Sequence, residues 1–347
     1  MNAPAPRISI LIATLNSGRT LRPCLESIRA QDYPAEALEI VVADGGSTDD
    51  TLAIARDCGV TRVVPNPLKT GEAGKSAAAA AATGDIFALV DSDNILPDRD
   101  WLATMAAPFA DPEVVASEPL HYTRRAEDGD LTRYFAMLGM TDPLCLFIGN
   151  YDRHCAVTGK WTEIPMETAD QGGWIKVFVK AGRPTPTFGA NGFLIRRSAL
   201  AAVAWQPYWF DVDVMRDVAA AAPDGRVCVA KVDCGIVHLY CRTLGEFARK
   251  QKRRVRDFLY FSPVRERAIV PGEHKRIVWG IVKFSLATLT VIPLLLQRFR
   301  GARRMPDPAW SLHVPVCFIT LWIYATTTLG KCLGLRQAPL SRDNWRQ

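Results

Sequence analysis

The chain has 347 residues, 48% hydrophobic and 22% charged, a globular composition that excludes an intrinsically disordered protein. The formal net charge of +6 is modest and much of it lies after residue 240, which favours anionic lipid or phosphate over nucleic acid as a partner. The 9 cysteines form no C-x-x-C pair, so the spacing typical of a zinc site or a compact disulfide framework is missing. We expect reduced, mostly buried thiols in a cytoplasmic environment, because no charged-then-apolar signal segment precedes the first apolar strand at 8–13.

The N-terminal part alternates between predicted strands and predicted helices. Apolar runs predict buried strands at 8–13, 38–43, 60–64 and 86–90, with helices at 19–31, 51–58 and 74–82 between them. Such alternation implies an α/β fold with a largely parallel sheet and right-handed crossovers. Ligands bind beyond the carboxyl ends of the strands in such sheets, so Asn16, Asp44 and the segment 91–93 are expected at a ligand crevice.

The middle of the chain is less regular. Residues from about 120 to 174 carry many aromatic and charged side chains and are expected to form a long insertion. A Gly/Asn turn near 188–192 leads into a strand that ends near 197, and another strand is predicted at 227–232. A basic helix is predicted at 244–261.

Two apolar stretches close the sequence, at 277–296 and 314–330, and both approach the roughly 20 residues that span a bilayer. The link between them contains four arginines, Arg298, Arg300, Arg303 and Arg304. The positive-inside rule disfavours carrying such a link across a membrane. A two-pass hairpin, a re-entrant or interfacial hairpin, and a pair of buried helices in a soluble domain therefore stay open, while the basic flanks favour lipid headgroups.

The strongest chemical signal is Asp91-Ser92-Asp93, which directly follows a predicted buried strand. Two carboxylates one residue apart at a strand end suit a hard divalent cation, Mg²⁺ or Mn²⁺, held against a diphosphate. The alternative is a solvated surface turn, since many turns match a D-x-D pattern.

A second signal is Asp44, which precedes the turn 45–49 (GGSTD). A carboxylate after a strand can accept hydrogen bonds from a ribose or a base edge, and the glycines allow close backbone approach. The alternative is a turn with a helix N-cap, supplied by Ser47 or Asp49. Asp44 itself fits the ligand role better.

In combination and in order, these segments resemble the family 2 glycosyltransferases, which have the GT-A fold. The matching pieces are Ile8–Asn16 (ISILIATLN), Val42–Thr51 (VADGGSTDDT), Gly71–Asp85 (GEAGKSAAAAAATGD), Leu89–Asp93 (LVDSD) and Gly189–Phe193 (GANGF), with a looser match around Asp211 to Asp213. The resemblance covers roughly residues 7 to 260. It implies a Rossmann-like, mostly parallel central sheet flanked by helices over 1–262, with a nucleotide-sugar-binding half (1–117) and an acceptor-side half (118–262). An apolar helical hairpin would follow in a membrane-associated region, 263–347.

Carried over by position, the resemblance implies a role for each matching residue. Donor contacts would come from Thr14, Asn16, Asp44, Lys75, Asp91 and Ser92, metal ligands from Asp91, Asp93 and His238, and an acceptor-side turn from Gly189, Asn191 and Gly192. The catalytic base would be Asp213 with Asp211 as the alternative, because the family usually has Glu-Asp where this chain has Asp-Val-Asp. Gln251, Arg253 and Arg254 resemble part of the Gln-x-x-Arg-Trp element of membrane-associated synthases, with Val255 in place of Trp, and would contact diphosphate or lipid.

Other interpretations of these residues stay open. A lone histidine at a strand end, such as His238, is often structural, and the basic residues of 251–254 also suit a helix on a membrane surface. A hydroxyl acceptor needs a base on the sugar face opposite the leaving diphosphate, which gives inversion by in-line displacement. A phosphate acceptor needs no base, and Asp213 would then position groups or balance charge.

The sequence therefore predicts an inverting hexosyltransferase that uses a UDP- or GDP-sugar donor, Mg²⁺ or Mn²⁺, and a sugar or lipid-linked acceptor. It would act at the cytoplasmic face of the inner membrane, in the synthesis of a cell-envelope polysaccharide or glycolipid, without nucleic acid. One alternative is a non-catalytic relative that binds nucleotide-sugar or lipid. Another is a nucleotidyltransferase, which normally has a Gly-rich, Arg/Lys-bearing loop after the first strand, a pattern that 14–19 matches poorly. The particular sugar, the acceptor and the oligomeric state are not predicted.

Overall fold

The computed structural model describes residues 5–189, 191–209, 211–261 and 272–333. The chain forms two compact units that interleave along the sequence. The sheet unit comprises Met1–Thr123 and Pro165–Leu239, and the helical unit comprises Arg124–Ile164 and Tyr240–Gln347. The sequence instead predicted a catalytic domain over 1–262 and a membrane-associated region over 263–347. The functional roles of these two parts stay a prediction.

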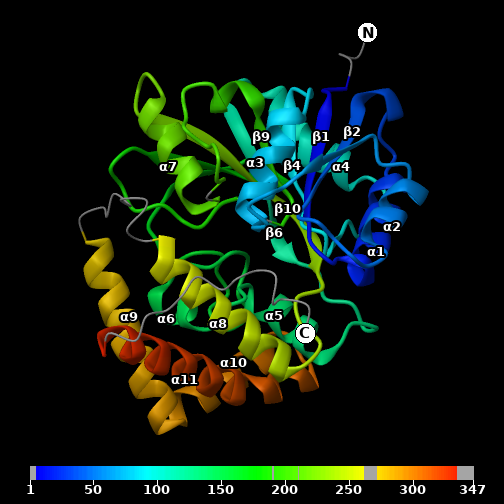
Figure 1. The fold of residues 1–347 in the computed structure, drawn as a ribbon. Helices are drawn as coiled ribbons and strands as arrows, with labels where there is room; N and C mark the ends of the chain where they lie inside the picture. Colours follow the sequence, from blue (N-terminus) through cyan, green and yellow to red (C-terminus); the bar gives the residue numbers. More distant parts are fainter. Residues whose placement is uncertain (1–4, 190, 210, 262–271, 334–347) are drawn as a thin grey trace. The chain divides into compact units, whose positions relative to one another are not determined.

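A ten-stranded mixed sheet forms the centre of the sheet unit (Figure 1). The strands are β1 (Ile8–Thr14), β2 (Leu38–Asp44), β3 (Arg62–Pro65), β4 (Ile86–Leu89), β5 (Asn94–Ile95), β6 (Val114–Tyr122), β7 (Glu167–Asp170), β8 (Trp174–Lys180), β9 (Phe193–Arg196) and β10 (Arg226–His238). Their order is β3-β2-β1-β4-β9-β6-β10-β8-β7, and β5 pairs with β10.

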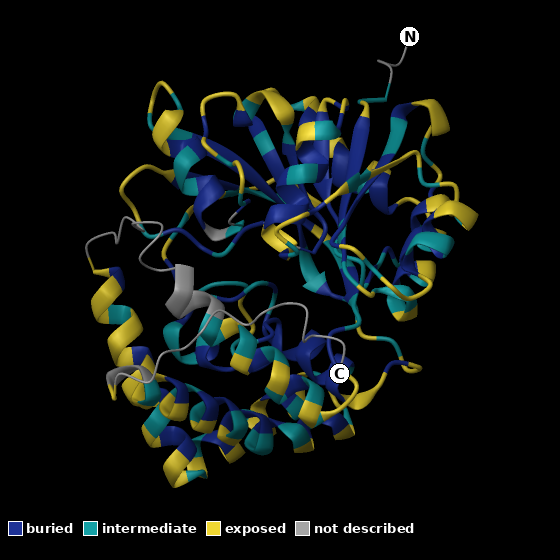
Figure 2. Ribbon diagram, viewed as in Figure 1, coloured by how far each residue is buried: buried dark blue, intermediate teal, exposed yellow. Residues whose placement is uncertain are grey.

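The half of the sheet built from β3, β2, β1 and β4 is parallel, as the alternation of strands and helices predicted. β1 is apolar along nearly its whole length because helices cover both faces of such a sheet, and its Ile8, Ile10 and Leu11 are fully buried. Figure 2 shows the strands of this unit as largely buried. Thr14 pairs with Asp44, so β1 and β2 end at the same edge.

The other half of the sheet departs from the mostly parallel arrangement that we expected. β9 runs antiparallel to both β4 and β6, and β8 runs antiparallel to β10 and β7. β9 is inserted between β4 and β6, whereas the long strand β10 is parallel to β6. The architecture is nevertheless an α/β sheet with flanking helices, as the sequence predicted.

Helices α1 (Gly18–Arg29), α2 (Thr51–Asp57), α3 (Gly71–Ala81), α4 (Trp101–Ala106) and α7 (Asp211–Ala221) flank this sheet. The start of α3 is fixed by Thr70, whose side-chain hydroxyl accepts a hydrogen bond from the backbone N–H of Ala73 at 2.8 Å. Gly74 allows α3 to lie directly on β1, since an added Cβ would come within 2.5 Å of Ala13 Cβ. This contact carries Lys75 to the carboxyl edge of the sheet.

The helical unit contains α5 (Asp130–Leu138), α6 (Leu144–Ile148), α8 (Leu244–Phe261), α9 (Glu273–Thr290), α10 (Ile292–Arg304) and α11 (His313–Cys332). The predicted basic helix at 244–261 is present as α8. The predicted apolar stretch 277–296 is not one helix, because the chain bends by 94° between α9 and α10. Val291 takes a positive φ of 63° at the bend, and Pro293 lies in the first turn of α10, where its missing N–H costs no hydrogen bond.

Within the described residues, one helix is long and apolar enough to cross a membrane by length and composition, Pro308–Gly330. The bent pair α9 and α10 passes the same criterion only if it is counted as one broken span. The predicted apolar hairpin thus takes the form of three helices, α9, α10 and α11.

Candidate active site

The carboxyl ends of β1 and β2 are joined through the carboxylate of Asp44, which is 8% exposed. Its Oδ1 accepts hydrogen bonds from the hydroxyls of Thr14 (2.9 Å) and Ser47 (2.6 Å). Its Oδ2 accepts from the backbone N–H groups of Gly46 (2.9 Å) and Ser47 (2.8 Å). A carboxylate offers about four acceptor positions, so Asp44 organises the turn after β2 in addition to any contact with a donor.

The loop after β1 is fastened to the same turn by Asn16, which takes a left-handed φ of 52°. Its backbone N–H donates to the hydroxyl of Ser47 at 2.8 Å, and its side-chain oxygen accepts from the N–H of Thr48 at 2.8 Å. The hydroxyl of Ser92 donates to that of Ser17 at 3.1 Å. The donor-side residues predicted from β1, β2 and the segment after β4 therefore lie along one connected edge.

Lys75 links α3 to two carboxylates that are distant in sequence. Its ammonium lies 2.8 Å from Asp211 Oδ2 and 3.6 Å from Asp91 Oδ1, and only 7% of its side chain is exposed. Burial disfavours the charged form of Lys75, but Asp211 and Asp91 outweigh it and hold the pKa of the ammonium above its usual value. Burial raises the pKa of Asp211 to about 6, although Lys75 acts in the opposite direction. This cluster brings predicted donor and catalytic residues together.

Asp93 and His238 meet through the pairing of two strands. β5 directly follows Asp93 and pairs antiparallel with the end of β10, so that Asn94 lies opposite His238. The backbone N–H of Leu239 also donates to the carbonyl of Asp93 at 2.8 Å. His238 Nε2 consequently lies 3.6 Å from Asp93 Oδ1.

Asn191 and Gly192, predicted to belong to an acceptor-side turn, are held against this region by a network that the sequence did not reveal. Asn191 accepts a hydrogen bond from the side-chain amide of Asn94 (2.9 Å) and donates to the hydroxyl of Tyr122 (3.0 Å). Asn94 also accepts from the backbone N–H of Asp91 at 2.9 Å. Gly192 has a φ of 87°, and an added Cβ would lie 2.8 Å from Ile236 and 2.9 Å from Trp101. Only the position of Asn94, immediately after the D-x-D pattern, could have suggested its role.

A buried ion pair fixes the other end of the turn. Lys231 and Glu118 lie opposite each other on β10 and β6, with 2.7 Å between Nζ and Oε2, and their side chains are 0% and 1% exposed. Glu118 Oε1 accepts a hydrogen bond from the N–H of Gly189 at 3.1 Å. Gly189 has a φ of 131°, and an added Cβ would lie 2.6 Å from the Cβ of Asp211. The ion pair therefore supports the turn on which the start of α7 rests.

Asp211 and Asp213 both lie in the first turn of α7, but only Asp211 belongs to the Lys75 cluster described above. Residues two positions apart on a helix lie on different faces. Asp213 is 6% exposed. The sequence ranked Asp213 first as the base and Asp211 second, and the choice between them stays a prediction.

The three residues predicted to contact diphosphate or lipid lie on α8, in the helical unit. Gln251 donates to the carbonyl of Thr141 at 3.2 Å, and Arg254 donates to the Thr141 hydroxyl at 2.9 Å and to Gln251 Oε1 at 3.3 Å. Arg253 is half-buried on the same helix. These contacts join α8 to the segment after α5, and the predicted role in binding diphosphate or lipid stays a prediction.

Asp93 and His238 can serve as a pair of metal ligands. Two atoms bound to one ion at about 2.1 Å can be at most about 4.2 Å apart, so the observed 3.6 Å is compatible with joint coordination. Their side chains are 22% and 13% exposed, so the pair is accessible. In the described part of the chain, no three His, Cys, Asp or Glu side chains form a metal site, and the Asp91 carboxylate lies beside Lys75. The residues therefore fit a cation that takes its remaining ligands from a substrate and water.

Comparisons with known proteins agree with this architecture. Glycosyltransferase AglE of Haloferax volcanii is 27% identical over 107 residues, which is 29% of this chain and 35% of that protein. The dolichyl N-acetyl-alpha-D-glucosaminyl phosphate 3-beta-D-2,3-diacetamido-2,3-dideoxy-beta-D-glucuronosyltransferase of Methanococcus voltae is 35% identical over 101 residues, 27% of this chain and 31% of that protein. The chain thus spans about a third of the length of these curated relatives. Among solved structures, the mannosyltransferase PcManGT from Pyrobaculum calidifontis, in complex with GDP-Man and Mn²⁺, has a TM-score of 0.50 and 18% identity, and the match covers 95% of this chain and 90% of that chain.

A family model matches the N-terminal part of the chain, and the fold comparison agrees with it. Residues 9–159 match the family model described as glycosyl transferase family 2. Over these residues the chain is similar to the family 2 glycosyltransferases, as the resemblance in the sequence implied. The predicted GT-A fold is confirmed.

Proposed function

We propose that the chain is an inverting glycosyltransferase of the hexosyltransferase class, which moves a sugar from a UDP- or GDP-linked donor to an acceptor. The observation that carries this proposal is the arrangement of two polar clusters in one sheet unit. One is Lys75 with Asp91 and Asp211, and the other is Asp93 with His238. Both include a residue of the segment between β4 and β5, at the edge of the sheet where ligands bind in α/β folds.

The donor would lie along the edge formed by the loops after β1 and β2. Thr14, Asn16 and the turn of Asp44 offer hydroxyl, amide and backbone groups for a nucleoside. Asp93 and His238 would hold Mn²⁺ or Mg²⁺, which neutralises negative charge on the leaving nucleoside diphosphate. The mannosyltransferase from Pyrobaculum calidifontis, which shares the fold, has GDP-Man and Mn²⁺ bound in its structure and so supports this assignment.

Asp211 would be the catalytic base for a hydroxyl acceptor. Lys75 pairs with the carboxylate of Asp211, and Gly189 packs against its backbone and Cβ. The position of the carboxylate is therefore fixed before substrate binds. Removal of the hydroxyl proton by such a group contributes roughly 10² to 10⁴-fold to the rate. Asp211→Asn should therefore lower kcat by about that factor, while Asp213→Asn should stay within about tenfold of the wild type. The opposite ranking would return the assignment to Asp213.

The acceptor is proposed to be membrane-proximal and lipid-linked, at the cytoplasmic face of the membrane. The apolar helices of the helical unit support this proposal. The Methanococcus voltae relative supports it as well, since its name describes transfer to a dolichyl-linked sugar phosphate. Such an acceptor places the reaction in the synthesis of a cell-envelope glycolipid or polysaccharide.

A donor screen tests the proposal. The full-length protein is incubated with Mn²⁺ or Mg²⁺ and a panel of UDP- and GDP-sugars, with and without polyprenyl phosphate, and release of nucleoside diphosphate is measured. We expect release from at least one donor, stimulation by the acceptor, and loss of release in Asp93→Asn. Asp57→Asn, which removes an exposed carboxylate paired with Arg22 on the surface, is the matched control and should keep full activity. Full turnover by Asp93→Asn would exclude the metal role, and no release from any donor would favour a non-catalytic relative.

A further inference from the structure

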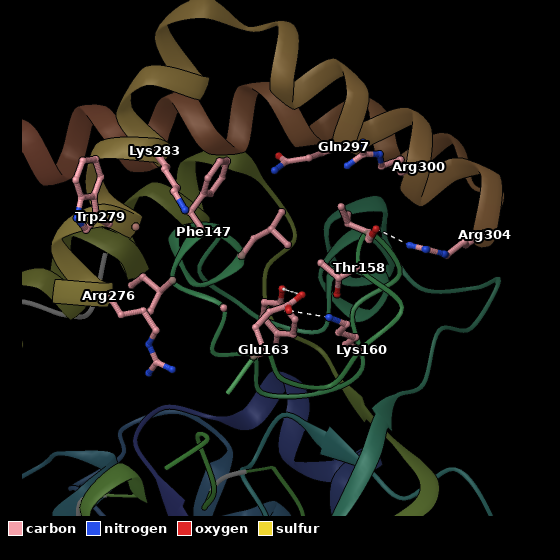
Figure 3. Close-up of a pocket in the computed structure, with 16 residues that line it drawn as sticks. Phe147, Thr158, Lys160, Glu163, Arg276, Trp279, Lys283, Gln297, Arg300 and Arg304 are labelled. Atoms are coloured by element: carbon pink, nitrogen blue, oxygen red, sulfur yellow. Dashed lines mark hydrogen bonds and ion pairs between the residues drawn. The ribbon is translucent and has the colours of Figure 1, made fainter. Parts of the chain in front are cut away.

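The helical unit contains a cavity that plays no part in the chemistry above. Its volume is about 680 Å³, within the range of roughly 300–1,000 Å³ typical of ligand pockets. It is lined by α6, the loop that follows it, α9 and α10 (Figure 3). Gly280 allows α9 to lie close against α6, since an added Cβ would come within 2.7 Å of Ile148.

The lining of this cavity is strongly cationic. It includes five basic side chains, Lys160, Arg276, Lys283, Arg300 and Arg304, and one acidic side chain, Glu163. Glu163 is paired with Lys160 at 2.8 Å, and the lining as a whole carries a net positive charge.

Two of these cations keep their charge free for a ligand. Lys283 on α9 and Arg300 on α10 are exposed, and no carboxylate among the described residues lies in ion-pair distance of either. Arg304 donates to the carbonyls of Ala156 and Val157, which orients its guanidinium without neutralising it. A group that carries at least one negative charge is therefore the complementary occupant.

The same helices expose an unusually apolar surface. Leu289, Ile292 and Phe299 are 68%, 66% and 63% exposed, and Trp279, which lines the cavity, is 55% exposed. Figure 2 shows α9 and α10 with many exposed positions. Exposed apolar side chains on the same helices as basic side chains are typical of contact with a lipid interface, where tryptophan is also enriched.

We propose that this cavity binds the phosphate headgroup of an anionic phospholipid. Lys283 and Arg300 contact the phosphate, and the acyl chains lie along the apolar side chains Leu289, Ile292 and Phe299. The occupant is a lipid and not free phosphate, because the cationic lining and the apolar surface belong to the same two helices. The 94° bend suits helices that lie in the interface and follow its surface. This site is independent of the sugar-transfer reaction proposed above.

A binding assay in nonionic detergent micelles tests the site, whether the chain spans a membrane or lies on it. Full-length protein is titrated with a fluorescent, acyl-labelled phosphatidylglycerol, and unlabelled competitors are added. We expect saturable binding, competition by unlabelled phosphatidylglycerol, and no competition by equal concentrations of phosphatidylcholine or inorganic phosphate. Absence of saturable binding, or equal competition by inorganic phosphate, overturns the proposal.

Two matched double variants distinguish binding at a specific site from diffuse attraction between charges. Lys283→Gln with Arg300→Gln removes two cations that line the cavity. Arg298→Gln with Arg303→Gln removes two exposed cations of α10 that do not line it. The first pair should weaken binding at least tenfold more than the second, with unchanged thermal midpoints because all four side chains are exposed. Equal weakening by the two pairs shows only diffuse attraction and contradicts the proposal.

Discussion

The buried ion pair between Glu118 and Lys231 offers a direct test of how Gly189 is held. Glu118→Gln keeps the shape of the side chain and an oxygen that can accept from the N–H of Gly189, but it removes the negative charge beside a fully buried ammonium. Breaking a buried pair by removing one partner costs about 3–5 kcal/mol. We therefore expect a loss of about that size in the free energy of unfolding.

The chain supplies a matched control at the same separation. Lys180 and Glu167 also lie 2.7 Å apart in the sheet unit, but each side chain is 48% exposed. Exposed pairs contribute about 0–1 kcal/mol, so Glu167→Gln should be nearly neutral. Charge type and distance are the same in the two pairs, so they differ mainly in burial. Glu167 also lies 3.5 Å from Arg226, and this second exposed contact contributes as little as the first.

Urea denaturation, followed by intrinsic tryptophan fluorescence, measures both variants. The difference in free energy is the shift in midpoint multiplied by the slope of the transition. Adding Lys231→Met to Glu118→Gln removes the ammonium that the first change leaves behind, and we expect the double variant to recover at least half of the loss. Equal midpoints for Glu118→Gln and Glu167→Gln would refute the reasoning.

Three further predictions follow from the site. Gly192→Ala should lower the free energy of unfolding by about 2–4 kcal/mol, because its backbone is left-handed and an added Cβ would lie 2.8 and 2.9 Å from neighbouring side chains. Gly172→Ala is the control, since Gly172 has a φ of 73° and no atom within 4 Å of an added Cβ. It should lose only the backbone part, about 1–2 kcal/mol, in the same urea assay. Lys75→Met should lower kcat/KM about 100-fold or more in the donor-release assay, because it removes the cation that holds Asp211; unchanged kcat/KM would show that the ion pair is only structural. His238→Gln should raise the Mn²⁺ concentration needed for half-maximal activity about tenfold, and an unchanged requirement would indicate that His238 is structural.

The local parts of this site were predictable from the sequence, and the long-range ones were not. Apolar runs that end in Thr14, Asp44 and Asp91 predicted strands whose carboxyl ends meet at one edge, because parallel strands leave little choice of arrangement. The meeting of Asp93 with His238 depends on pairing between the two-residue strand β5 and the end of β10. Such a short strand has no periodicity of its own, so the sequence could raise the possibility of this pair but not establish it.

The placement of β9 and the bend between α9 and α10 could not be predicted from hydrophobic patterns in the sequence. The antiparallel insertion of β9 between β4 and β6 is a matter of topology, which a four-residue apolar strand does not encode. The bend between α9 and α10 was hidden because apolar side chains continue through it. Pro293 was the visible signal, since proline favours the first turn of a new helix over the interior of an old one.

The measurement that most directly tests the central claim is electron paramagnetic resonance of free Mn²⁺, titrated with the full-length protein in the presence of UDP or GDP. If Asp93 and His238 coordinate a cation together with a diphosphate, the wild type should bind free Mn²⁺ far more strongly with one of the nucleotides than without it. Asp93→Asn should lose this effect. Equal depletion of Mn²⁺ by the wild type and Asp93→Asn would contradict the account.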